Sequence, residues 1–293
     1  MRGLEQSDSP YARAVIRTKL GDVVRTWNTY NLHYGGERPR SIKQADAVTA
    51  NLLHKAVDGR GLLEASRVPE ANGWVLSQSR LQSGRAFIDS VKVRGNLLPT
   101  GSRSSRGRRG PGNDGWCDAG CRSKESLNHI SQACVWTHGG TVRRHDTVSR
   151  FVCGRLRQRG FTAIEEPRIP TRSGIRKPDI IADKNGKPVV LDTQIKSDTL
   201  KLAEEHARKR RYYDTPDVLD WVRSKFGSEN MPLVSTITLS RRGVWAPESA
   251  TMLRELGLSQ AEQRLISVMV VEKTAVIFRE FKRSTLMRTA QHQ

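Results

Sequence analysis

The chain has 293 residues, of which 50 are Lys or Arg and 30 are Asp or Glu, so its formal net charge is +20. A surplus of this size favours nucleic acid as a partner over an anionic membrane surface, because the basic residues lie in loops and on several elements and not on one amphipathic helix. With no apolar run long enough to span a membrane, no signal-peptide core and only four cysteines, we expect neither a membrane protein nor a secreted disulfide-bonded protein.

The first 99 residues are predicted to form a mainly helical linker. Apolar side chains recur at helical spacing over residues 11–32 and 41–57, and Ser41 is placed to cap the second helix. A turn-rich stretch follows over residues 58–72, and then a short helix over about residues 83–93. Because no chemical motif appears before residue 100, we expect this segment to connect and not to catalyse.

Residues 100–115 consist largely of Gly, Ser, Arg and Pro, which predicts a flexible basic hinge. We expect arginines in such a segment to follow the phosphates of a nucleic acid, although a solvated spacer has the same composition. The hinge arginines assigned to nucleic-acid binding are Arg103, Arg106, Arg108 and Arg109. Together with the cysteines that follow, the hinge makes up a second segment, residues 100–140.

Four residues of metal-binding types follow at short spacing: Cys117, Cys121, His129 and Cys134. Thiolates and imidazole in such sets converge tetrahedrally on zinc, and in a reducing compartment clustered cysteines hold metals more often than disulfides. Few apolar residues lie between the first and last ligand, so the metal would supply the folding free energy. His138 and His145 remain alternatives to one of the four, whereas Cys153 is expected to be a buried thiol on a helix.

Residues 141–293 are predicted to fold as an α/β domain with a mixed sheet. The expected order is a helix over 142–159, strands over 161–169, 178–183 and 188–195, helices over 199–213 and 218–226, a strand over 233–239, and helices over 248–256 and from 259 onward. Asn185-Gly186 is the typical signal of a two-residue hairpin turn. The second and third strands should therefore form a hairpin within a sheet flanked by helices.

The hairpin is predicted to bring two aspartates together. Asp179 begins the first of its strands and Asp192 lies near the end of the returning strand, so their carboxylates would lie side by side. Two such acids repel each other, and a hard divalent cation bound by their oxygens removes the repulsion. A magnesium ion there would activate water for phosphodiester cleavage. Two ordinary solvated acids are the simpler interpretation of the same residues.

Alternation along the second hairpin strand places Asp192, Gln194 and Lys196 on one face. The pattern resembles the PD-(D/E)xK nuclease signature, in which a lysine two residues after the second acid orients the attacking water. Here that position holds Gln194, so either Lys196 or a lysine from another element would take the role. The next helix carries three polar side chains on one face: His206, Lys209 and Tyr213. Packed against the sheet, Lys209 would reach the acids.

In its motifs the chain resembles the C-terminal part of the site-specific non-LTR retrotransposon proteins that insert into ribosomal RNA genes. In that family a reverse transcriptase is followed by a linker, a CCHC zinc knuckle and a restriction-like endonuclease. The resemblance covers about residues 97–245. The matching segments are the arginine-rich residues 98–109, the four cysteine and histidine ligands, Thr137-His138-Gly139-Gly140, Arg144-His145-Asp146, Arg176-Lys177-Pro178-Asp179, Asp192, Lys209 with Tyr213, and Arg242-Gly243-Val244-Trp245.

This resemblance implies a restriction-endonuclease-like domain in which Asp179 and Asp192 are the catalytic acids and magnesium ligands, Lys209 is the displaced lysine, and Tyr213 supports them. It also implies that the linker and knuckle bind DNA while the endonuclease nicks one strand to prime reverse transcription. The expected partners are target ribosomal DNA, element RNA and the polymerase portion of the same protein, in the nucleus. Further residues assigned to nucleic-acid binding are Arg144, Arg176 and Lys177. No polymerase motif occurs in the chain, so we expect nicking without copying.

Two other functions fit the same sequence. The first is a nucleic-acid-binding module with an inactive nuclease fold, which the glutamine at position 194 favours. Such a module would bind DNA with a steep dependence on salt and leave it intact with any divalent metal. The second is an RNA-binding structural protein in which the cysteine and histidine module dominates, and a preference for single-stranded RNA over duplex DNA would identify it.

Overall fold

A computed structural model describes residues 36, 37, 39, 41–76, 82–106 and 115–291, and the chain divides into two compact units, residues 1–57 and 58–293. In the first unit, α4 spans Ile42–Lys55. The side chain of Ser41 accepts a hydrogen bond from the Gln44 amide at 3.2 Å, which confirms the predicted helix cap. The helix expected over residues 11–32 lies outside the described residues.

The second unit contains a four-stranded mixed sheet in the order β1-β4-β5-β6. Its strands are β1 Thr162–Glu165, β4 Ile180–Lys184, β5 Lys187–Lys196 and β6 Leu233–Ser240. β4 is antiparallel to both of its neighbours, β1 and β5, whereas β5 and β6 are parallel. Asn185 and Gly186 have φ values of 54° and 71°. Both lie in the left-handed region that a two-residue hairpin needs, so the predicted turn between β4 and β5 is confirmed.

The single strand expected over residues 161–169 is wrong. Glu166 has a φ of 46°, which ends β1 and turns the chain away from the sheet. The chain then forms a separate hairpin from β2 (Ile169–Thr171) and β3 (Gly174–Arg176). This β2–β3 hairpin leads directly into Lys177 and Asp179, so in the chain it immediately precedes one of the predicted acids.

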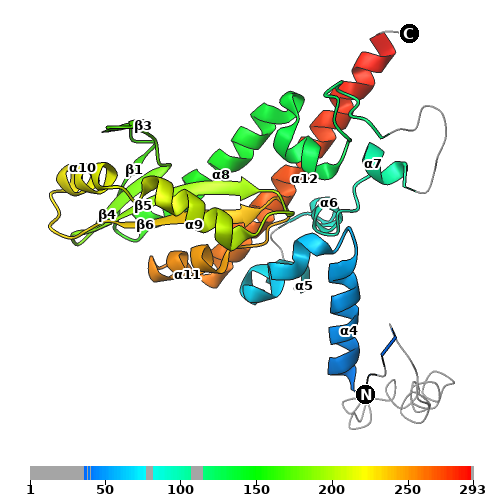
Figure 1. Cartoon of the computed structure of the whole chain (residues 1–293), viewed down its shortest axis with the longest axis horizontal. Helices are drawn as coiled ribbons and strands as arrows, with labels where there is room; N and C mark the ends of the chain where they lie inside the picture. Colours follow the sequence, from blue (N-terminus) through cyan, green and yellow to red (C-terminus); the bar gives the residue numbers. More distant parts are fainter. Residues whose placement is uncertain (1–35, 38, 40, 77–81, 107–114, 292–293) are drawn as a thin grey trace. The chain divides into compact units, whose positions relative to one another are not determined.

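Helices cover both faces of the sheet (Figure 1). Apolar side chains of α8 (His138–Gln158), α11 (Pro247–Glu255) and α12 (Gln260–Gln291) pack with one set of alternating strand residues, including Ala182, Leu191 and Ile237. The other set, including Ile181 and Val190, packs with α9 (Leu202–Tyr213) and α10 (Pro216–Phe226). This confirms a mixed α/β fold, and it places the even-numbered side chains of β5 on the α9 side.

The remaining elements are short. They are η1 Arg60–Arg67, η2 Pro69–Asn72, α5 Gly73–Leu76, α6 Gly84–Arg94, α7 Gly101–Ser104, the single π-helical turn η3 His129–Ala133, and η4 Val135–Thr137. A second core brings together Trp74, Ile130 and Phe281, from segments that the sequence assigned to three different domains. In the described second unit these segments share one core, because α12, which carries Phe281, packs against the elements that carry the other two residues.

The hinge predicted from residue 100 is wrong for its first part. The side chain of Thr100 accepts a hydrogen bond from the Arg103 amide and begins α7, and residues 107–114 lie outside the described residues. Among the described helices, none combines the length and apolarity that a membrane span requires.

Candidate functional site

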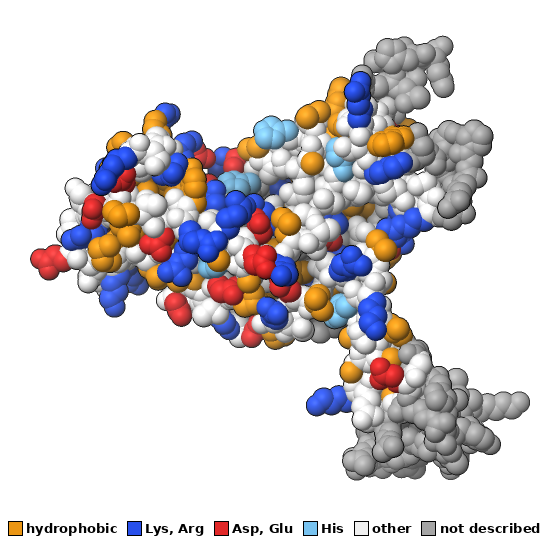
Figure 2. All heavy atoms as spheres, viewed as in Figure 1, with side chains coloured by type: hydrophobic (Ala, Val, Ile, Leu, Met, Phe, Trp, Pro, Cys, Tyr) orange, Lys and Arg blue, Asp and Glu red, His pale blue; other side chains and the backbone are white. Residues whose placement is uncertain are grey.

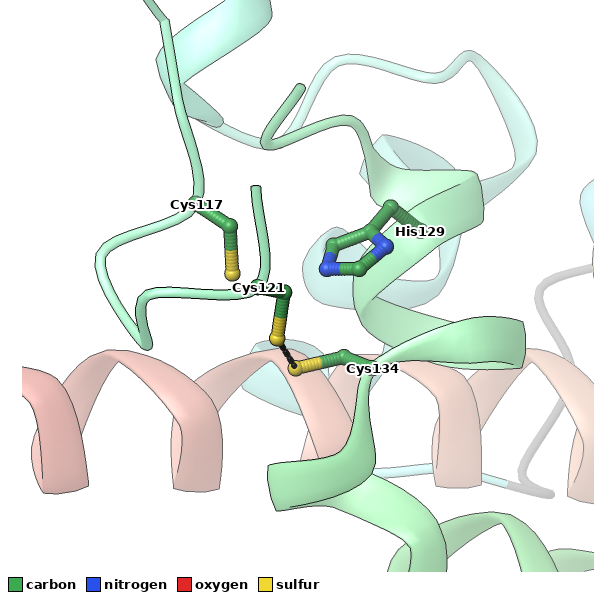
Figure 3. A group of neighbouring side chains, drawn as sticks. All are labelled: Cys117, Cys121, His129 and Cys134. Atoms are coloured by element: carbon green, nitrogen blue, oxygen red, sulfur yellow. Dashed lines mark hydrogen bonds between the residues drawn. The ribbon is translucent and has the colours of Figure 1, made fainter. Parts of the chain in front are cut away.

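The predicted cysteine and histidine ligands meet at one point. The candidate ligand atoms of Cys117, Cys121, His129 and Cys134 all lie within 4.8 Å of one another. Figure 3 shows that the first two come from the loop before η3, the histidine from η3 itself, and Cys134 from just after it. All four cysteines of the chain are free, so none of this set is used in a disulfide. We call these four residues the Cys3His cluster.

The geometry and chemistry of the Cys3His cluster fit zinc. The Sγ atoms of Cys121 and Cys134 are 3.6 Å apart, close to the edge of about 3.8 Å that a tetrahedron with zinc–sulfur bonds of about 2.3 Å requires. His129 Nε2 is buried and has no hydrogen-bond partner among the described residues, as expected of a nitrogen that is reserved for a metal. Burial raises the pKa of the Cys134 thiol to about 12, and a bound cation would offset the cost of its thiolate.

A buried carboxylate fixes the loop of the cluster to its surroundings. Glu125 is fully buried, and its oxygens accept hydrogen bonds from the Gly101 amide at 2.8 Å and the Asp118 amide at 3.2 Å. Lys282 of α12 lies 2.5 Å from the same carboxylate and 2.9 Å from Asp118. The cluster is therefore tied to α7 and to α12.

The second site lies where β4 begins and β5 nears its end. Ile180 pairs with Leu191 across the hairpin, so Asp179 and Asp192 stand opposite each other one step further along, on the same face by alternation. Asp179 Oδ2 accepts a hydrogen bond from the Thr193 amide at 2.6 Å. The predicted juxtaposition of the two aspartates is confirmed, and we call them the acid pair.

The helix α9 adds the two residues that were expected from it. Lys209 Nζ lies 3.3 Å from Asp192 Oδ2, and the Tyr213 hydroxyl lies 2.8 Å from Asp192 Oδ1 and 2.8 Å from the Lys177 carbonyl oxygen. The Lys209 ammonium also lies 5.2 Å from the centre of the Tyr213 ring. Asp192 is therefore held between an ammonium group and a phenol, in a buried position.

The alternative lysine is engaged elsewhere. Lys196 Nζ pairs with Glu205 at 3.1 Å, and Gln194 Nε2 donates to the Glu205 carbonyl oxygen at 3.1 Å and to Thr238 Oγ1 at 2.6 Å. Both side chains face α9, as alternation predicted, but they join the sheet to the start of that helix. Of the two candidate lysines, only Lys209 contacts the acid pair.

The pKa values at this site are shifted by burial and by the closeness of the two aspartates. Burial, together with the neighbouring Asp179 charge, raises the pKa of Asp192 to about 6, although Lys209 and Tyr213 lower it. Burial and the same two carboxylates raise the pKa of the Tyr213 phenol well above its usual range, so this hydroxyl stays protonated as a donor. A divalent cation at the acid pair would remove the repulsion that raises the Asp192 pKa.

His145 is a member of this site that the sequence reasoning did not assign to it. It was considered as a zinc ligand, but its Nε2 atom lies 3.1 Å from Asp179 Oδ2 and 3.0 Å from the Thr193 carbonyl oxygen, and its Nδ1 lies 3.2 Å from Asp146. The hydrogen bond to Asp179 raises the pKa of His145 to about 9. His138 is likewise outside the Cys3His cluster and begins α8.

One of the expected nucleic-acid-binding arginines is internal. Arg144 is 1% exposed and donates to Thr274 Oγ1 at 2.9 Å and to the Ser131 carbonyl oxygen at 3.0 Å. Its guanidinium fastens α8 to α12 and to η3, and it presents nothing to a ligand at the surface. The assignment of Arg144 to nucleic-acid binding is therefore corrected.

The other basic residues of that set are nearer the surface. Arg103 and Arg106 both lie 2.8 Å from Asp58 Oδ2, so the two hinge arginines are partly neutralised. Arg176 and Lys177 lie at the base of the β2–β3 hairpin. Arg108 and Arg109 lie outside the described residues.

Sequence comparison relates the chain to larger proteins, and no protein-family model matches it. It is 36% identical over 233 residues to the retrovirus-related Pol polyprotein from type-2 retrotransposable element R2DM of Drosophila melanogaster. It is 32% identical to the Pol polyproteins from type-1 retrotransposable element R2 of Nasonia vitripennis, over 237 residues, and of Popillia japonica, over 242 residues. These alignments cover 79%, 80% and 80% of the chain but 22%, 23% and 48% of the relatives, so the chain spans less than half of their length. The chain is thus homologous to part of the Pol polyproteins of R2 retrotransposable elements.

Proposed function

We propose that this chain is a metal-dependent DNA endonuclease of the PD-(D/E)xK type, which nicks target DNA to prime reverse transcription of a retrotransposon RNA. The observation that carries the proposal is the meeting of Asp179, Asp192 and Lys209 at one point of a mixed sheet. Two carboxylates and an ammonium group are the side chains that magnesium-assisted phosphodiester cleavage needs. The homology to R2 Pol polyproteins supports a role on nucleic acid.

In this mechanism the acid pair would hold Mg²⁺, which supplies Lewis-acid stabilisation of the phosphate and lowers the pKa of bound water. Lys209 lies beside Asp192, where its charge would orient the attacking water and offset negative charge that develops on the phosphate. Tyr213 keeps the Asp192 carboxylate in a fixed orientation through its hydroxyl. His145 does the same for Asp179 from the opposite side of the strand end.

The Cys3His cluster would hold one structural Zn²⁺ and, with the linker, bind DNA near the target. We further propose that the target is ribosomal DNA, that element RNA and the polymerase portion of the full-length protein are partners, and that the protein acts in the nucleus. These proposals follow from the resemblance of the motifs and agree with relatives that are Pol polyproteins.

A plasmid-nicking assay with magnesium tests the proposal. Asp179→Ala and Asp192→Ala should each abolish nicking, and Lys209→Ala should slow it by about two to three orders of magnitude, the cost of one well-placed electrostatic group. Lys196→Ala is the matched control, because it removes a lysine of similar burial that pairs with Glu205 instead. Nicking by the aspartate variants at the rate of the parent would show that the acid pair is not the active site.

A non-catalytic nucleic-acid-binding module is the second candidate, favoured by Gln194 at the usual lysine position. Both hydrogen bonds that its amide nitrogen donates go to α9 and β6, so this nitrogen does not orient water as the usual lysine would. Under this function the parent would bind DNA with a steep salt dependence and would not nick it with Mg²⁺ or Mn²⁺.

A further inference from the structure

Arg176, at the end of the β2–β3 hairpin, is held by an aromatic side chain. Its guanidinium carbon lies 4.1 Å from the centre of the Tyr212 ring, and its Nη1 donates a hydrogen bond to the Tyr212 hydroxyl at 3.0 Å. Within the described part of the chain, Arg176 forms no ion pair with an acidic side chain. Its orientation is therefore fixed without neutralising its charge.

The neighbouring cations of the hairpin differ in this respect. Arg172 Nε lies 3.2 Å from Asp217, and Lys177 Nζ lies 3.0 Å from Glu166. A phosphate that approached either of them would have to compete with a carboxylate. Arg176 is the cation of this group that is oriented and has no such competitor.

Arg176 lies one layer of side chains away from the acid pair. Tyr212 is 44% exposed and stands edge-to-face against Tyr213, whose hydroxyl contacts Asp192. The Lys209 ammonium lies 5.3 Å from the Tyr212 ring centre and 3.3 Å from Asp192. A continuous row of cationic and aromatic groups thus leads from the acids to the surface of the hairpin, and Figure 2 shows Lys and Arg side chains gathered over this part of the molecule.

We propose that Arg176 binds a backbone phosphate of the nucleic-acid strand, next to the phosphate that is cut, and that Tyr212 is a positioning residue that holds the guanidinium for it. The location next to the cut depends on the proposed endonuclease function, whereas the phosphate contact does not. A planar guanidinium that is already oriented loses little side-chain freedom when it forms a forked pair of hydrogen bonds with phosphate oxygens. Tyr212 itself makes no contact with the nucleic acid in this arrangement.

Fluorescence anisotropy with a labelled DNA duplex, in buffer without magnesium so that nothing is cut, tests the phosphate contact. Arg176→Ala should weaken binding about tenfold and lower the slope of log affinity against log salt by about 0.9, the value for one phosphate contact. Arg172→Ala is the matched control, because it removes a cation of the same hairpin that is paired with Asp217, and it should change affinity less than about twofold. An Arg176→Ala variant that binds like the parent, or like Arg172→Ala, would overturn the assignment.

A double-mutant cycle tests the role of Tyr212. Tyr212→Ala should weaken binding in the parent but not in the Arg176→Ala background, because it acts only through the arginine. Equal losses in both backgrounds would mean that Tyr212 contacts the nucleic acid itself, which overturns its positioning role.

The location is tested with duplexes that carry one neutral methylphosphonate, once nicking has been mapped. The parent should lose affinity when the neutral linkage adjoins the cut, and Arg176→Ala should be insensitive to it. Sensitivity of Arg176→Ala at that linkage would overturn the location. If the aspartate variants show that the chain does not cut, the anisotropy results still decide the phosphate contact.

Discussion

Replacing Asp192 by asparagine should stabilise the fold and abolish nicking. A pKa raised from 3.8 to about 6 means that the ionised carboxylate costs the folded state about 3 kcal/mol relative to the unfolded chain. The sign follows from proton binding: the folded protein holds this proton more tightly, so the cost is absent below pH 3.8, grows up to about pH 6, and is complete above it. Asparagine matches the shape of the neutral acid and keeps an oxygen for the Tyr213 hydroxyl. We therefore expect Asp192→Asn to be up to about 3 kcal/mol more stable than the parent at about pH 8.

Urea denaturation, followed by the fluorescence of buried tryptophans such as Trp245, measures this difference. The advantage of Asp192→Asn should shrink toward zero at about pH 4, where the parent carboxyl is protonated. Magnesium should stabilise the parent at about pH 8 and leave the asparagine variant unchanged, because binding to the folded state alone raises its stability. The reasoning would be refuted if Asp192→Asn were less stable than the parent at about pH 8, or if its gain in free energy of unfolding were the same at both pH values.

Three further predictions concern the rest of the molecule. Removal of zinc by a chelator, or Cys134→Ser, should unfold the loop of the Cys3His cluster and lower the thermal midpoint, and metal analysis of the parent should find about one zinc per chain. In the parent the buried Arg241 guanidinium lies 2.8 Å from the Asp198 carboxylate, and Asp198→Ala leaves it without an acidic partner. We therefore expect Asp198→Ala to lower the free energy of unfolding, measured with urea, by about 3–5 kcal/mol, and the control Arg172→Ala to leave it almost unchanged. The stability that His145 contributes should be complete below pH 6.5 and be lost as the pH rises through about 9. The urea midpoint of His145→Gln should therefore lack this part of the pH dependence. A pH profile like that of the parent would contradict the prediction.

The parts of the site that were predictable depend on local signals. Asn185-Gly186 fixes the hairpin, its register sets Asp179 opposite Asp192, and helical spacing places Lys209 and Tyr213 on one face of α9. The Cys3His ligands were likewise found from their spacing alone. In each case a short-range pattern determines which side chains meet.

The parts that were missed depend on how distant elements dock. His145 reaches Asp179 only because α8 packs across the sheet, and Arg144, one residue earlier, turns inward to Thr274 of α12 for the same reason. Sequence spacing alone cannot distinguish these two neighbours, of which one belongs to the site and the other to the interior. The β2–β3 hairpin was hidden because strands of three residues are too short to show alternation.

The helix α12 has a consequence for the whole second unit. It packs against α8, which lies on the sheet, and also against η3, which carries a ligand of the Cys3His cluster. Because this one helix packs against both elements, the Cys3His cluster and the acid pair cannot change their separation without disrupting that packing. Under the proposed function, nucleic acid held at the cluster would accordingly reach the acid pair at a fixed distance, so the position of the cut would depend on that distance and not on the base sequence between the two sites.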